Sequence, residues 1–353
     1  MKAWWCLVLV ACSGAPSAAT PPEEAPVQEM GLERALEEAR AGVVDKNLAK
    51  LFVDHWLFTL EQEPTWATEL GVHDFDDRID DNAKSAIEAR RNFRRELLGR
   101  ARGIDRASLG AGDAAHLSLF IDMQEALVAA DEACHFEEWT LSPRDNPVTR
   151  WNHLREVHQV KTLRDAHNLL SRYRAIAHSI DNEVSNLKTG AARGLFTTSE
   201  SARRVIDVCE KQLREPLAKW PMLEPARAEH PDFPRAELDA YRRDLTNVVT
   251  NEIRPALERY TRFLQKHILP QARGEEQSGL SALPIGEACY AARIRQETTL
   301  PMTAREIHEL GLAAIAESDA AIAALGKKLF GSATLAETLA KLRSDTSLYF
   351  ESA

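Results

Sequence analysis

The residues that most often carry metal chemistry occur in this chain without the spacing that the chemistry needs. The one His-Glu pair is His308–Glu309. A zinc-binding helix of the metallopeptidase type has a second histidine four residues after the first, because imidazoles at that spacing share one face of the helix and reach one metal. Leu312 occupies that position. The spacing therefore predicts that His308 and Glu309 are ordinary helix residues, and that this chain contributes no metal site.

Two further groups of candidate ligands fail a similar geometric test. His153 and His158 are five residues apart, about 140° around a helix, so they cannot share a metal without distortion. The acidic segment 74–81 has Arg78 where a calcium loop of the EF-hand type needs an oxygen ligand. We expect this segment to be a structured turn whose carboxylates cap the helix after Asn82 and pair with Arg78.

Residues 1–11 have the pattern of a lipoprotein signal peptide. Lys2 supplies the positive charge, and a short apolar run leads to small residues before Cys12, which would become the lipidated first residue. The run is too short to span a bilayer. Residues 12–29 then comprise the lipidated cysteine and a tether rich in Pro, Ala and Ser that we expect to be disordered. The alternatives are an ordinary secretory signal cut near Ala18–Ala19 and, ranked third, an uncleaved cytoplasmic start.

The net charge and the cysteine content indicate which partners the chain can bind and whether its cysteines form disulfides. The formal net charge is −10, which disfavours nucleic acid as a partner because phosphate binding needs clustered cations. The cysteines beyond the signal region, Cys134, Cys209 and Cys289, are far apart and odd in number, so no disulfide framework is implied. One pair could form in an oxidising envelope, but we expect buried free thiols.

From residue 30 onward the apolar residues recur at helical spacing, and alternating runs of β-branched residues are absent. The pattern predicts an all-α fold, a multi-helix layered bundle over residues 30–353. Pro255 lies inside the longest helical segment and predicts a kink or break near Asn251. The main helices are expected over residues 45–63, 82–102, 110–133, 162–188, 199–220, 234–268 and 334–343.

The least generic passage is residues 278–312. A turn opens a short helix that carries Tyr290, the helix stops at Thr298–Pro301, and Thr303 with Glu306 forms a capping box at the start of a second helix. This order of features resembles the family of bacterial proteins named the domain of unknown function 885. The other segments that resemble the family are Pro64–Gly71 with Asp76–Arg78, Gly190–Leu195, Leu342–Asp345 and Leu348–Phe350.

The resemblance implies a zinc-metallopeptidase-like protein in which a later His-Glu pair and a Gly-His-His motif supply the metal. The sequence given ends at Ala353, before any such motif. We therefore expect the N-terminal portion of an envelope-anchored lipoprotein, catalytically incomplete, with zinc only in full-length relatives. Its expected partners are the membrane, through the lipid anchor, and a missing C-terminal half or a peptide substrate.

No catalytic residue can be assigned. Tyr290, Arg293 and His308 are candidates for lining a cleft because they lie in the most specific passage. The alternative function is a stand-alone, non-enzymatic lipoprotein that binds a peptide or protein partner in a helical groove.

Overall fold

The computed structural model describes residues 31–350, so the predicted signal peptide, Cys12 and tether lie outside the described residues. Within residues 31–350 the chain is helical and has no β-strand, which confirms the predicted all-α class. One isolated bridge pairs Thr198 with Arg273. No helix in this part of the chain is long and apolar enough to span a membrane.

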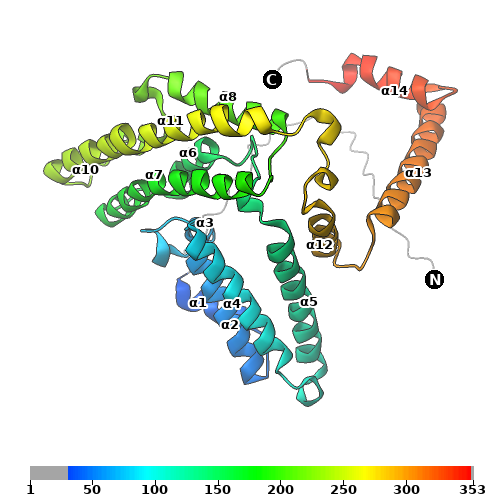
Figure 1. Ribbon diagram of the computed structural model, residues 1–353, viewed down its shortest axis with the longest axis horizontal. Helices are drawn as coiled ribbons and strands as arrows, with labels where there is room; N and C mark the ends of the chain where they lie inside the picture. Colours follow the sequence, from blue (N-terminus) through cyan, green and yellow to red (C-terminus); the bar gives the residue numbers. More distant parts are fainter. Residues whose placement is uncertain (1–30, 351–353) are drawn as a thin grey trace, which may run out of the picture.

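The N-terminal helices form a bundle in the lower part of Figure 1. The side chain of Asp45 begins α2 by accepting hydrogen bonds from the backbone N–H groups of Asn47 and Leu48, both at 2.9 Å. Buried leucines from three of these helices, among them Leu48 and Leu97, form a compact core. The helices are α1 (Leu32–Ala39), α2 (Lys46–Gln62), α3 (Pro64–Glu69), α4 (Lys84–Arg102) and α5 (Ala111–Cys134).

A second group of helices, in the upper part of Figure 1, contains the largest apolar core. The long helix α7 packs against α10 and α11, and Tyr173 and Tyr260 are fully buried between these elements. The helices of this group are α6 (Pro147–Val157), α7 (Leu163–Ala192), α8 (Ser199–Arg214), α9 (Glu224–Arg227), α10 (Arg235–Val248) and α11 (Arg254–Phe263).

The predicted break near Asn251 is present as a widened turn. Between α10 and α11 the backbone forms a π-helical turn over Val249–Ile253, and Pro255 follows in the first turn of α11. Proline has no N–H to donate to the carbonyl four residues earlier, and a π-turn is one way in which a helix accommodates the loss. The proline therefore widens one turn while the helical course continues.

The last described helices separate from the rest of the molecule. Helix α12 (Gly286–Thr298) packs along α5, whereas α13 (Ala304–Phe330) and α14 (Leu335–Ser344) pack chiefly on each other and extend as an arm. The predicted capping box at the start of α13 is confirmed, because the Thr303 side chain accepts from the backbone of Glu306 and the Glu306 side chain accepts in return.

The expectation of free thiols is wrong for two of the three cysteines. Cys134 at the end of α5 and Cys289 in α12 form a disulfide, with their Cα atoms 4.7 Å apart although 155 residues separate them in sequence. The packing of α12 along α5 brings the two residues together, and this long-range packing cannot be read from cysteine spacing. Cys209 is a buried free thiol, as expected.

Candidate functional site

The three predicted cleft residues lie in different surroundings. Arg293 of α12 lines a pocket of about 200 Å³ between α4, α5 and α12. Its guanidinium lies 5.4 Å from the centre of the Phe136 ring and pairs with Glu297 at 2.5 Å. Tyr290 is 44% exposed and is not among the residues that line this pocket. His308 is exposed on α13. The structure therefore does not bring the three side chains together into one pocket.

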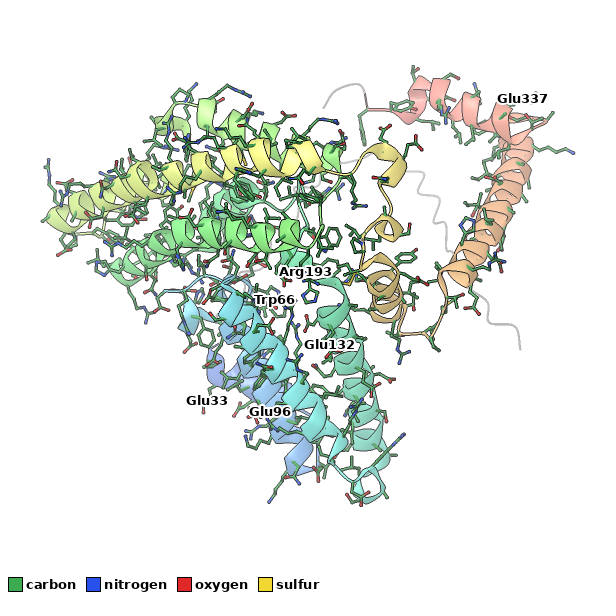
Figure 2. All side chains as sticks on the ribbon, viewed as in Figure 1. Glu33, Trp66, Glu96, Glu132, Arg193 and Glu337 are labelled. Carbon is green, nitrogen blue, oxygen red and sulfur yellow. A yellow bond between two sulfur atoms is a disulfide. The ribbon has the colours of Figure 1, made fainter. Side chains whose placement is uncertain are left out.

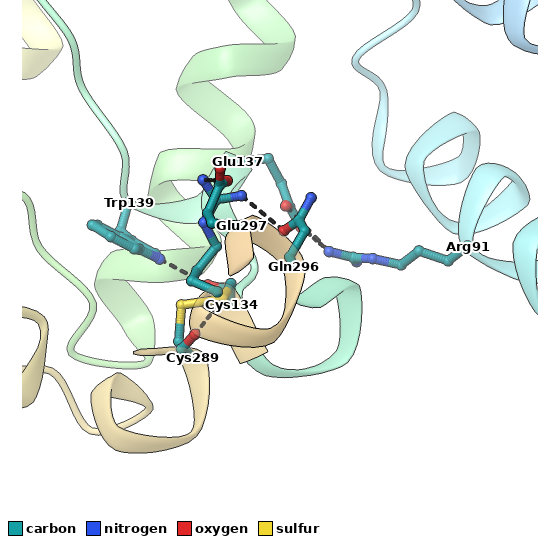
Figure 3. Close-up of a disulfide and its surroundings, with 8 residues drawn as sticks. Arg91, Cys134, Glu137, Trp139, Cys289, Gln296 and Glu297 are labelled. Atoms are coloured by element: carbon teal, nitrogen blue, oxygen red, sulfur yellow. Dashed lines mark hydrogen bonds and ion pairs between the residues drawn. A yellow bond between two sulfur atoms is a disulfide. The ribbon is translucent and has the colours of Figure 1, made fainter. Parts of the chain in front are cut away.

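The disulfide supports the floor of the pocket at Arg293. Figure 3 shows the Cys134–Cys289 bridge beneath the short segment that carries Glu137 and Trp139. The indole N–H of Trp139 donates to the carbonyl oxygen of Cys134 at 2.8 Å, and Arg91 reaches across from α4 to Glu137 at 2.9 Å. The bridge thus fixes the end of α5 against α12.

Among the described residues, one group of histidine and carboxylate side chains has ligand atoms within metal-bridging reach. It comprises His135, Glu137 and Glu138, with His135 Nδ1 at 3.9 and 4.0 Å from the two carboxylates. Arg91 pairs with Glu137 and Arg193 pairs with Glu138. Because a guanidinium already neutralises each carboxylate, we interpret this group as an ion-pair cluster. Sequence spacing did not indicate it.

A buried polar network joins the acidic segment and α3 to α7. Arg172 of α7 is fully buried and donates to the backbone carbonyls of Arg78 and Pro64, at 2.8 and 2.9 Å. It also donates to the hydroxyl of Thr68 at 2.7 Å, and that hydroxyl lies 2.6 Å from the buried carboxylate of Asp76. A fork of guanidinium donors is the group best suited to hold several acceptors in a fixed geometry. Arg172 therefore fixes the acidic turn on α7.

His158 completes this network as a neutral imidazole. Its Nε2 lies 2.9 Å from the carbonyl oxygen of Asp165, and its Nδ1 lies 2.9 Å from Arg172. A carbonyl can only accept and a guanidinium can only donate, so the hydrogen belongs on Nε2. Burial, and then the charge of Arg172, lowers the pKa of His158 below its ordinary value. As expected from their spacing, His153 and His158 do not converge, because His153 is exposed.

The acidic segment confirms one of its two predicted roles: Arg78 pairs with a carboxylate of the segment, but no described side chain caps the first turn of α4. The carboxylate of Asp81 accepts from the backbone N–H of Ala83 at 2.8 Å just before α4, and Arg78 pairs with Asp77 at 3.5 Å. What the sequence did not indicate is that Asp76 is buried and held by Arg172.

An open apolar groove of about 590 Å³ lies between α1, α2 and α5. Leu119 and Met123, one helical turn apart on α5, are 57% and 45% exposed along it. Two imidazoles face the groove, and burial, followed by the charge of Arg94, lowers the pKa of His55. The residues that line the groove are Ala35, Glu38, Ala39, Phe52, His55, Trp56, Leu70, Val72, His116, Leu119, Phe120 and Met123.

The arm formed by α13 and α14 exposes an apolar surface. Each of the two helices has one buried residue, Gly326 in α13 and Thr338 in α14. These two residues contact each other where the helices cross. Figure 2 shows the side chains of the arm standing clear of the other helices, with Glu337 in the first turn of α14. The large apolar side chains that are more than half exposed on the arm and just after it are Leu310, Leu312, Ile315, Leu325, Leu329, Leu348, Tyr349 and Phe350.

Comparison with known proteins places this all-α chain in a family. Residues 64–353 match the family described as bacterial protein of unknown function (DUF885), so the chain belongs to that family and the resemblance seen in the sequence is confirmed. The structure is similar to a crystal structure described as that of "the putative lipoprotein from Colwellia psychrerythraea", with a TM-score of 0.77 and 14% sequence identity. The match covers 87% of this chain and 55% of that chain, so this chain spans about half the length of that protein. A comparison with curated proteins finds no match.

Proposed function

We propose that this chain is an envelope-anchored lipoprotein whose helices form the N-terminal portion of a larger, metallopeptidase-like fold, and that it is catalytically incomplete on its own. The exposed apolar surface of α13 and α14 carries the proposal, because contiguous apolar patches of this kind mark surfaces that bind other protein. Burying one such side chain contributes roughly 1.5–3 kcal/mol. The greater length of the similar solved chain supports further helices as the partner of this surface.

The test measures the free surface of the arm on residues 30–353. We expect a helical circular dichroism spectrum, binding of a hydrophobic dye, self-association and no peptidase activity. Replacing Leu310, Ile315 and Leu325 by Gln lowers dye binding and self-association if the arm is responsible. Glu317→Gln, an exposed change on the same helix, serves as the matched control. A sharply cooperative melt of a monodisperse monomer without dye binding refutes the larger-fold proposal.

Location in the envelope has two supports. The Cys134–Cys289 disulfide favours an oxidising compartment, because disulfides persist outside the reducing cytosol. The signal pattern favours Cys12 as the lipidated residue. We expect Cys12→Ala to release the protein from the membrane fraction after export. A mutant that keeps its full signal and still sediments with membranes contradicts the anchor at Cys12.

We also propose that residues 30–353 hold no stoichiometric zinc. A zinc site with His308 would need a second histidine at position 312, which is a leucine. The carboxylates of Glu137 and Glu138 near His135 are paired with arginines. Elemental analysis of the purified protein is the measurement. A content close to one zinc per chain that is lost in His308→Ala contradicts the proposal.

The alternative function, a stand-alone lipoprotein that binds a peptide or protein in a helical groove, is favoured by the apolar groove beside α5. The groove is of a size that suits a few apolar side chains, and Leu119 and Met123 line its open side. Fluorescence anisotropy of a labelled leucine-rich helical peptide tests this. Binding that Met123→Glu weakens and Glu132→Gln, an exposed change farther along α5, leaves unchanged supports the alternative.

A further inference from the structure

A second cavity, of about 600 Å³, lies between the α3 end of the N-terminal bundle and the junction of α6 with α7. Unlike the apolar groove, it is lined mainly by charged and polar side chains. The residues from 69 to 73 separate the two cavities. Glu69, Gly71 and His73 line the polar cavity, whereas Leu70 and Val72 line the apolar groove. The chain therefore builds two chemically different cavities on the two sides of one short segment.

The base of the polar cavity is rigid. The Asp76 carboxylate is 5% exposed and lies 2.8 Å from Nδ1 of His73, 2.6 Å from the Thr68 hydroxyl and 3.5 Å from the guanidinium of Arg172. Since Arg172 is fully buried and bonded to backbone carbonyls, this wall cannot reorient without breaking several hydrogen bonds. A preorganised wall lowers the entropic cost of binding a ligand.

One side of the cavity carries carboxylates with spare acceptor capacity. His153 lies between two of them, with Nδ1 2.9 Å from Glu156 and Nε2 3.6 Å from Glu69. Glu156 also pairs with Arg155 at 2.7 Å, whereas Glu69 has no other ion-pair partner within residues 31–350. Each carboxylate has about four acceptor positions, so both keep free ones, and both side chains are exposed and line the cavity. An ammonium group, which has three donors, is a suitable partner for this pair.

The other side carries cations without a carboxylate partner. Lys161 and Arg164 line the cavity, and within residues 31–350 neither side chain forms an ion pair. The Asp165 carboxylate also lines this side, where it accepts from the backbone N–H groups of Lys161 and Thr162 at 3.0 and 2.8 Å. Arg164 lies in the first turn of α7, a 30-residue helix whose dipole adds positive potential at this end, and Lys161 lies two residues before the helix. Asn168 follows Arg164 by one helical turn and also lines the cavity. Free guanidinium and ammonium groups at a helix start favour a carboxylate or phosphate oxygen as the partner.

We infer that this polar cavity binds a small zwitterion, a free amino acid or short unblocked peptide. Its carboxylate is held by Lys161 and Arg164, and its ammonium group by Glu69 and Glu156. The volume lies within the range of small-molecule sites, and the two charged sides match the two ends of such a ligand. The inference does not depend on the proposed function, because it uses neither the anchor nor the apolar arm.

Isothermal titration of the purified soluble chain (residues 30–353) tests the inference with four probes: alanyl-alanine, its N-acetyl derivative, its C-terminal amide and inorganic phosphate. We expect alanyl-alanine to bind at least tenfold more tightly than either blocked form and than phosphate. Glu69→Gln and Arg164→Ala should each weaken the dipeptide at least tenfold. Arg174→Ala, an exposed arginine on the same helix that does not line the cavity, should leave binding unchanged.

All three altered side chains are exposed, so the variants should fold, and unchanged circular dichroism spectra check this. Absence of binding by alanyl-alanine overturns the inference. So does equal affinity for the blocked forms, or for phosphate, because the cavity would then recognise a single charge. Loss of binding in Arg174→Ala to the same extent as in Arg164→Ala overturns the assignment of the carboxylate side.

Discussion

Replacing Arg172 by Met tests the buried network most directly. Methionine fills a similar volume but donates no hydrogen bond, so the change leaves the carbonyl of Arg78 and the Nδ1 of His158 without their donor. The Pro64 carbonyl loses one donor and keeps the Thr68 hydroxyl. It also removes the positive charge that lies 3.5 Å from the buried Asp76 carboxylate. Breaking a buried charged pair costs about 3–5 kcal/mol, and each unsatisfied buried group about 1–3 kcal/mol where water cannot enter. We expect a loss of about 4 kcal/mol in the free energy of unfolding.

Urea denaturation followed by circular dichroism measures this loss as a lower midpoint at an unchanged slope. Arg174→Met, an exposed change two residues further along the same helix, should stay within about 0.5 kcal/mol of the parent protein. Arg172→Lys should fall between the two, because an ammonium keeps the charge but lacks the planar fork of donors. A loss below about 1 kcal/mol for Arg172→Met would show that water or a rearranged backbone satisfies the freed groups, and the reasoning would fail.

Three further predictions concern stability. Gly190→Ala should cost about 1–3 kcal/mol, because a Cβ atom there would lie 1.9 Å from the carbonyl oxygen of Glu138; a neutral effect in thermal melts would show that α7 shifts freely. Stability should be full above about pH 6.5 and fall below it, since burial and a neighbouring guanidinium lower the folded-state pKa of His158. His158→Gln should flatten the fall measured by urea titrations between pH 5 and 7, and an unchanged slope contradicts this assignment. The double change Cys134→Ser, Cys289→Ser should lower stability by about 2–5 kcal/mol under oxidising conditions, and equal calorimetric melts would rule that out.

Local features of the fold could be predicted from sequence because they depend on neighbouring residues alone. The capping box of Thr303 and Glu306 and the break caused by Pro255 are of this kind, and both are present. The ends of the helices were predicted less accurately than their positions. The helix expected over residues 199–220 ends at Arg214, six residues earlier, where the chain turns toward Pro216.

Features that depend on how distant helices pack could not be predicted. Nothing near Cys134 in the sequence indicates that α12 will lie beside it, so the disulfide was missed. The buried role of Arg172 was missed for the same reason, because its acceptors come from a turn about 100 residues earlier in the chain. Helix periodicity identifies the apolar stripe on α13, but it cannot say whether a partner covers that stripe. In this structure Leu310 and Ile315 are both 59% exposed.

The packing of α12 along α5 has a consequence for the order of events during synthesis. Synthesis proceeds at about 5–20 residues per second, so the 155 residues from Cys134 to Cys289 take about 8–30 s to be made. During that time the face of α5 that packs on α12 lacks this partner. Cys209 emerges before Cys289, and an oxidant of the oxidising compartment that takes two electrons from Cys134 and Cys209 would join these two in place of the native pair. Burial in the core of the second helix group raises the pKa of Cys209 to about 12, so little of the reactive thiolate exists once that group has folded. Early folding of α7, α8 and α11 would therefore protect the later native pairing against a competing one.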